Sequence, residues 1–186
     1  MMKTILWVAF GLMCAAQIFV PAQMILSREA VLKKGQPFKF KMQPYDPVDP
    51  FRGNYLQLAY EANTVQVDSG EWDMGGEAYA ILTTDSAGFA KVESLSKTPP
   101  SPGVYYFKTN VSYATAGEAF LMHPFDRYYI ESKMAPEAEE AVRNALIDSS
   151  ATAYAIVYVK GDRAVLKSLN INGKRLEEIV GHQKYK

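Results

Sequence analysis

The densest group of polar side chains lies in a proline-rich segment, residues 44–60. Three prolines within seven residues restrict its backbone, and its charged side chains are Asp46, Asp49 and Arg52. The Arg52 guanidinium could bind a carboxylate or phosphate of a ligand, or it could pair with one of the two carboxylates and fix the turn. We expect the internal ion pair, and two carboxylates without a closing glutamate make a poor calcium loop. Gly53 would permit a positive φ angle where the next strand begins.

A second polar group alternates along a predicted strand, with Arg127, Tyr129 and Glu131 on one face and Tyr128 and Ile130 on the other. We interpret it as a cross-strand tyrosine pair with a surface ion pair. The chain has twelve tyrosines, which could also line a binding groove because each ring is apolar and each hydroxyl is polar. Alternation fits both interpretations.

Few other residues could carry chemistry. Cys14 is the single cysteine, which excludes an intrachain disulfide and a cysteine-built zinc site. His123 and His182 have no acidic or cysteine partner at ligand spacing, so we expect structural or solvated histidines. The sequence contains no glycine-rich phosphate loop, nucleophile elbow or HExxH motif. We therefore expect no cofactor, no metal and no catalytic site.

The composition narrows the class of protein further. Twenty basic and twenty acidic residues give a net charge of zero, which argues against a nucleic-acid-binding protein. At 48% hydrophobic residues the chain is too apolar to be disordered, and 186 residues suffice for one domain plus a membrane segment.

A long apolar segment precedes this domain. Between Lys3 and Arg28 lie 24 uncharged residues, which as a helix would cover roughly 36 Å, more than a hydrocarbon core of about 30 Å. The alternative is a cleaved signal peptide, since small residues in the segment 20–22 could be read by a signal peptidase. Against cleavage, the apolar run continues through residues 24–26. We expect an uncleaved transmembrane anchor.

The charges beside this segment support two orientations. Residues 28–41 carry five cations and one acidic residue, and a strict positive-inside count would hold the following domain in the cytoplasm. A signal-anchor with a three-residue tail, in contrast, usually keeps its N-terminus inside. The basic residues could also rest on anionic lipid headgroups. We divide the chain into an anchor over 1–27, a basic juxtamembrane segment with the first strand over 28–41, and a β-rich domain over 42–186.

Alternating apolar residues predict that the domain consists mostly of strands. Phe38, Phe40 and Met42 alternate with polar residues, and a second alternating series spans residues 56–62 before its parity changes after Asn63. That change indicates a β-bulge or a strand break. The remaining strand candidates are 77–84, 88–95, 103–113 and 118–130, the last interrupted at Pro124, and a hairpin of 153–160 and 163–171 with its turn at Gly161-Asp162.

One helix is predicted after Pro136, where an apolar stripe over residues 138–146 follows helical spacing. Asn172-Gly173 is a predicted turn, and a charged tail follows it. Together these elements predict an α+β fold that is mainly antiparallel β and barrel-like, has one amphipathic helix, and is preceded by an N-terminal transmembrane helix.

The segment G-N-Y-L-Q-L-A-Y resembles the motif of the GDYXXLXY family through Gly53, Tyr55, Leu58 and Tyr60, with Asn54 in place of the family's aspartate. The resemblance extends over nearly the whole chain: Pro21, Met24-Ile25, Arg28-Glu29, Gly35, Pro44, Asp46-Pro47, Asp49, Arg52, Arg127-Tyr128-Tyr129-Ile130, Pro136 and Ile171-Asn172-Gly173-Lys174. The change at Asn54 removes the motif's only charge. If the family's aspartate is a turn residue, asparagine can replace it with little loss.

The resemblance implies a bacterial inner-membrane protein with an extracytoplasmic domain and no established activity, encoded beside or fused to multi-pass membrane proteins. Our leading hypothesis is a single-pass, non-catalytic accessory subunit of a multi-pass membrane protein, or an envelope sensor, whose partners are that protein and the lipid bilayer. One alternative is an envelope enzyme loosely similar to membrane-bound signal peptidases, although Ser27 lacks their Ser-Met-x-Pro setting. A lysine such as Lys91 or Lys108, buried beside a serine, would favour it. Another alternative is a lipid- or glycan-binding module with a tyrosine-lined groove.

Overall fold

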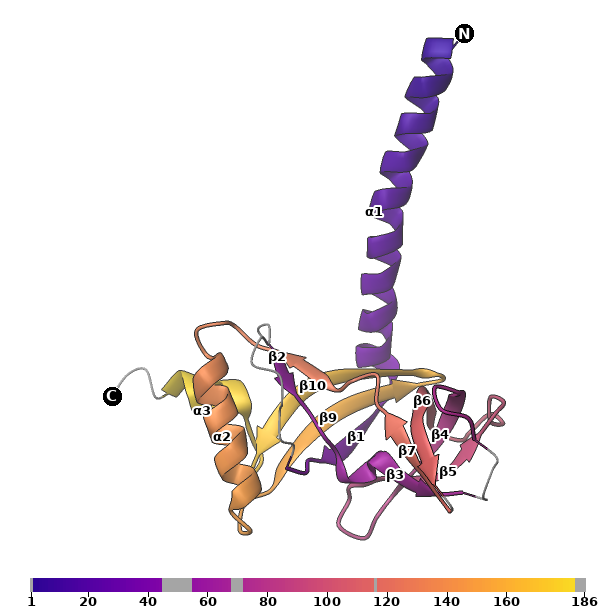
Figure 1. The fold of residues 1–186 in the computed structure, drawn as a ribbon. Coiled ribbons are helices and arrows are strands. Elements are labelled where there is room, and N and C mark those ends of the chain that lie inside the picture. Colours follow the sequence, from indigo (N-terminus) through magenta and orange to yellow (C-terminus); the bar gives the residue numbers. More distant parts are fainter. Residues whose placement is uncertain (1, 45–54, 68–71, 116, 183–186) are drawn as a thin grey trace.

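The computed structural model describes residues 2–44, 55–67, 72–115 and 117–182. Helix α1 (Met2–Lys34) projects away from a β-rich domain, as Figure 1 shows. The helix is long and apolar enough to cross a membrane, and a signal sequence near the N-terminus can meet the same two criteria. It continues through the basic residues 28–34, so this part of the predicted juxtamembrane segment is helical.

Helix α1 ends where its backbone meets strand β9. The Gly35 amide donates a hydrogen bond of 2.7 Å to the Val31 carbonyl. A Cβ atom at position 35 would lie 2.5 Å from that carbonyl oxygen and 3.0 Å from the carbonyl oxygen of Val159. Only glycine therefore fits this junction without a backbone shift.

The first sheet has the order β1-β9-β10-β11 and is antiparallel throughout. It contains β1 (Gln36–Lys41), β9 (Ala153–Lys160), β10 (Arg163–Ile171) and β11 (Lys174–Arg175). The predicted hairpin of β9 and β10 is present with its expected bounds. Asn172 and Gly173 have φ angles of 50° and 83°, as the tight turn of an Asn-Gly hairpin requires.

The predicted charged tail contains one more helix, α3 (Leu176–His182). Its Leu176 and Val180 side chains are buried, because they lie one turn apart and face the same side. The helix has three apolar residues, Leu176, Ile179 and Val180, which are too few for a period to stand out among charged neighbours. The longer helix α2 (Ala135–Ile147) agrees with the prediction, with Ala138, Val142 and Ala145 buried, and it packs against α3.

The second sheet has the order β3-β7-β6-β4-β5. Its strands are β3 (Thr64–Gln66), β4 (Glu77–Thr84), β5 (Ala90–Ser96), β6 (Tyr106–Thr115) and β7 (Glu118–Met122). The outer strands β3 and β5 contact each other, so the sheet curls into a nearly closed barrel, in agreement with the predicted fold class. Strand β5 begins later than predicted because the Asp85 carboxylate accepts the amides of Ala87 and Phe89 in a turn.

A short two-stranded sheet completes the domain and consists of β2 (Tyr55–Gln57) and β8 (Arg127–Tyr129). The predicted strand 118–130 is thus divided into β7 and β8 around Pro124. The parity change after Asn63 is a strand break, formed by the 3₁₀ turn η1 (Glu61–Asn63). The core lies between the two larger sheets, where Phe40 of β1 contacts Phe107 of β6 at 6.2 Å between ring centroids.

Candidate functional site

The charged part of the proline-rich segment lies outside the described residues. This applies to five predicted site residues: Asp46, Asp49, Arg52, Gly53 and Asn54. The described part of the motif begins at Tyr55. Its residues divide between two places, the α1 side of the domain and the core.

The short sheet brings Tyr55, Arg127 and Tyr129 together on one face. Tyr55 pairs with Tyr129 across β2 and β8, and their ring centroids are 5.7 Å apart. The Arg127 guanidinium lies 5.3 Å from the centre of the Tyr55 ring, at cation–π distance. Tyr129 and Glu131 are exposed on the same face, and Tyr128 and Ile130 are buried on the other, as the alternation predicts.

Arg127 is held mainly by its neighbours on this face. A hydrogen bond with Tyr129 raises the pKa of the guanidinium, and the charge of Asp126 adds to this effect. The Asp126 carboxylate is 3.9 Å from the Arg127 Nε atom, which is beyond hydrogen-bond range. That carboxylate instead accepts a hydrogen bond of 3.1 Å from the Gln57 side-chain amide. The Arg127 side chain remains 54% exposed.

Arg127 borders a hollow of about 450 Å³ between α1, β8 and β10, which we call the β8–β10 hollow. Figure 1 shows that β10 and β2 lie on the side of the domain from which α1 projects. Tyr128 and Tyr129 are the two tyrosines in its described lining. Its described lining consists of Arg28, Pro124, Phe125, Asp126, Arg127, Tyr128, Tyr129, Ala164, Val165 and Leu166.

A second hollow, of about 420 Å³, lies at the junction of α1 with β1. Lys34 and Lys160 border it, together with the proline-rich loop before β6 and the exposed Tyr105. The sequence indicates this loop through its prolines but gives no sign that it meets the end of α1.

The last tyrosine of the motif, Tyr60, belongs to the core. Its side chain is 1% exposed, and its hydroxyl donates a hydrogen bond of 2.9 Å to the Phe125 carbonyl. Burial raises the pKa of this phenol well above its usual value, with a smaller contribution from the charge of Asp126. Leu58 is also buried, so these two motif positions hold the fold together.

His123 occupies the centre of the same core. Four aromatic rings surround it at 5.0–5.9 Å between centroids, and they belong to Phe40, Tyr60, Phe107 and Phe125. Burial lowers its pKa to about 4, and hydrogen bonds to the backbone at Leu121 and Ala62 oppose this effect only in part. Its Nε2 atom has no hydrogen-bond partner among the described residues. His123 is therefore a neutral core residue at pH 7.

Glu177 is a half-buried polar residue that the sequence does not reveal. The Tyr128 hydroxyl donates a hydrogen bond to its carboxylate, which links β8 to α3. The second carboxylate oxygen is buried without a partner among the described residues. A helix predicted for the segment after Gly173 would include Glu177 next to Leu176, which is buried.

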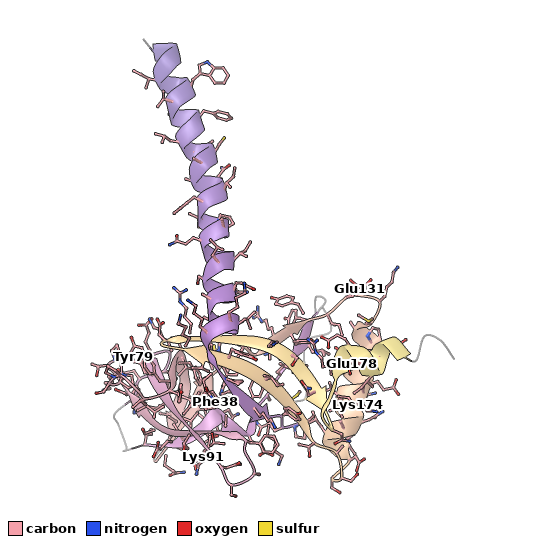
Figure 2. All side chains as sticks on the ribbon, turned by 180° about the vertical axis from the view of Figure 1, so that it is seen from behind. Phe38, Tyr79, Lys91, Glu131, Lys174 and Glu178 are labelled. Atoms are coloured by element: carbon pink, nitrogen blue, oxygen red, sulfur yellow. The ribbon has the colours of Figure 1, made fainter. Side chains whose placement is uncertain are left out.

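The lysines that could serve a serine–lysine enzyme have other surroundings. The Lys108 ammonium forms an ion pair of 2.7 Å with Glu77, and Lys91 is exposed at the end of the domain remote from α1, as Figure 2 shows. Neither is a buried general base beside a serine. Within the described ranges, no group of three histidine, cysteine, aspartate or glutamate residues could hold a metal ion.

No curated protein and no solved structure matches the chain. The sequence profile of the family described as GDYXXLXY protein, in contrast, matches residues 17–169. The match begins inside α1 and ends in β10, so it includes both the helix and the β-rich domain. The chain therefore belongs to the GDYXXLXY family.

Proposed function

We propose that the protein is a membrane-anchored, non-catalytic accessory subunit whose domain lies outside the cytoplasm and docks on a multi-pass membrane protein. The observation that carries this proposal is the exposure of α1: no residue of its 18-residue apolar window is buried in the described structure. Apolar side chains that are exposed over such a length need lipid or a partner helix to cover them.

The junction between α1 and the domain supports a fixed arrangement. Val31 of α1 is buried against the domain, and α1 contacts both β9 and β10. The Arg163 guanidinium donates a hydrogen bond to the Ser27 hydroxyl. Since the helix also continues without interruption to Lys34, a membrane that holds α1 would hold one side of the domain toward its surface.

Two polar side chains within α1 favour a protein partner over lipid alone. Gln17 and Gln23 are both exposed in the described structure. In a hydrocarbon core each side-chain amide needs a hydrogen-bond partner, and polar side chains of neighbouring helices commonly provide one. A multi-pass protein offers such helices, and the family resemblance implies such a neighbour.

Affinity purification of the intact chain from its native membranes in a mild detergent tests this proposal. We expect one multi-pass membrane protein at a fixed molar ratio, and we expect the double substitution Gln17→Leu and Gln23→Leu to reduce that ratio several-fold. Ile18→Leu with Ile25→Leu is the matched control in the same helix and should leave the ratio unchanged. A monomer without any membrane partner would contradict the proposal.

Two further measurements test the anchor and its orientation. The intact mass of the purified protein should include residues 1–22, whereas a cleaved signal peptide would remove them. Protease added to spheroplasts should degrade the domain if it lies outside the cytoplasm. Protection of residues 35–186 until the cells are lysed would place the domain in the cytoplasm instead.

A further inference from the structure

We propose that the β8–β10 hollow binds the phosphate group of an anionic phospholipid from the membrane that α1 spans. This inference rests on the membrane anchor of the proposed function and does not require a protein partner. The occupant is a phosphodiester, and its source is the lipid headgroup at the membrane surface.

The charges of the hollow suit a phosphate. Arg28 of α1 and Arg127 of β8 both border it, so two arginines from separate elements lie beside the same space. A guanidinium can bind two phosphate oxygens at once. Among the described residues, Arg127 forms one ion pair, with the Asp126 carboxylate 3.9 Å from its Nε atom, which is beyond hydrogen-bond distance. Among the described lining residues Asp126 carries the one carboxylate, and Gln57 already donates to it.

The position of Arg28 along α1 determines how deep the hollow lies relative to the membrane. Arg28 is the first charged residue after 24 uncharged ones. If these residues fill the hydrocarbon core, Arg28 lies at the level of the headgroups. Ile25 and Leu26 are 67% and 70% exposed in the preceding turn, where the acyl chains of a bound lipid could lie.

The walls of the hollow suit an amphipathic ligand. Ala164, Val165 and Leu166 of β10 provide an apolar wall, and Tyr129 provides a ring that is 71% exposed. Tyrosine is enriched at membrane surfaces because its ring is apolar and its hydroxyl is polar. A volume of about 450 Å³ is within the range of about 300–1,000 Å³ that is typical of small-molecule sites.

Native mass spectrometry of the full chain in detergent, titrated with phosphatidylglycerol, tests this proposal. We expect one bound lipid per chain and a weaker complex for Arg28→Gln and Arg127→Gln. Each should lose about 5-fold in affinity, because a basic side chain near an anionic lipid surface contributes about 1 kcal/mol. Lys91→Gln removes the same charge at the remote end of the domain and should bind like the wild type (Figure 2).

Four results would overturn the proposal. One is unchanged binding by both arginine variants while thermal melting shows that they are folded. Another is an equal loss of lipid affinity in the Lys91→Gln variant, because binding would then depend on the net charge alone. The third is equal binding of the zwitterionic phosphatidylcholine. Inorganic phosphate alone, added at millimolar concentration, should leave the lipid bound, whereas its displacement would identify free phosphate as the ligand and contradict the lipid assignment.

Discussion

The family motif places two tyrosines, Tyr55 and Tyr60, in contrasting environments. Tyr60 is in the aromatic core, where it donates a hydrogen bond to a backbone carbonyl and contacts His123. Tyr55 is on the α1 side of the domain, where it contacts Arg127 and Tyr129. One motif thus contributes both to folding and to the surface that we assign to the membrane.

The two regions are joined through one short segment, residues 125–127. The Phe125 carbonyl accepts the Tyr60 hydroxyl, and the Asp126 carbonyl accepts the Leu58 amide at 2.8 Å. Arg127 follows directly and faces the hollow. These hydrogen bonds from Leu58 and Tyr60 therefore fix the position of Arg127. The buried residues of the motif thus support the surface on which its other tyrosine, Tyr55, lies. The following predictions test this division, from the largest expected effect to the smallest.

Phe40→Ala should lower the free energy of unfolding by about 3–5 kcal/mol, the usual cost of removing a buried aromatic ring. Phe40 is fully buried and contacts four other rings of the core. Urea denaturation of the full chain in detergent provides the measurement. Tyr129→Ala is the surface control and should change the stability by less than about 0.5 kcal/mol. Similar losses in the two variants would contradict the division.

The stability of the fold should fall in acid because of His123. Its pKa is about 4 in the folded state and about 6.5 in the unfolded chain, so only the unfolded chain gains the proton between these values. Protonation of the unfolded chain therefore leaves the free energy of unfolding unchanged above pH 6.5. It lowers that free energy by roughly 3 kcal/mol in total as the pH falls toward 4.

His123→Gln should make the stability less dependent on pH over this range, since glutamine does not titrate. Unfolding midpoints of wild type and variant at pH 4.5 and pH 7 give the comparison, and the carboxylates contribute equally to both proteins. Equal losses of stability in the wild type and the variant between these two pH values would contradict this role of His123.

Tyr60→Phe should cost about 1–2 kcal/mol, because the Phe125 carbonyl would lose its hydrogen bond in a buried position. Tyr55→Phe removes the same atom from the surface tyrosine and should cost less than about 0.5 kcal/mol. Thermal or urea unfolding of both variants measures the difference. Equal effects would show that the two motif tyrosines do not differ in role.

Much of the fold follows from local patterns in the sequence. The β9–β10 hairpin, helix α2 and strand β4 were predictable because each has a strong period and its own turn or cap residues. The nearly closed barrel was predictable only as a class, because the contact of β3 with β5 joins residues far apart in the chain. Helix α3 was missed because its three apolar residues are too few to show a period.

The division of the motif was not predictable from spacing. Alternation places Leu58 and Tyr60 on one face and Tyr55 on the other, but it does not say which face is buried against the core. The β8–β10 hollow was also beyond prediction, since Arg28, Arg127 and Val165 come from three separate elements. The partly buried hydrogen bond between Tyr128 and Glu177 likewise joins two separate elements, β8 and α3.

The central claim is that the side of the domain containing Tyr129 lies at the membrane surface. Spin labels at Tyr129→Cys and Lys91→Cys, each in a Cys14→Ala background and in lipid nanodiscs, test it through their access to oxygen in the lipid and to a water-soluble nickel reagent. We predict headgroup depth for the label at position 129 and full water access at position 91, the remote end of the domain (Figure 2). Full water access at both positions would contradict the claim.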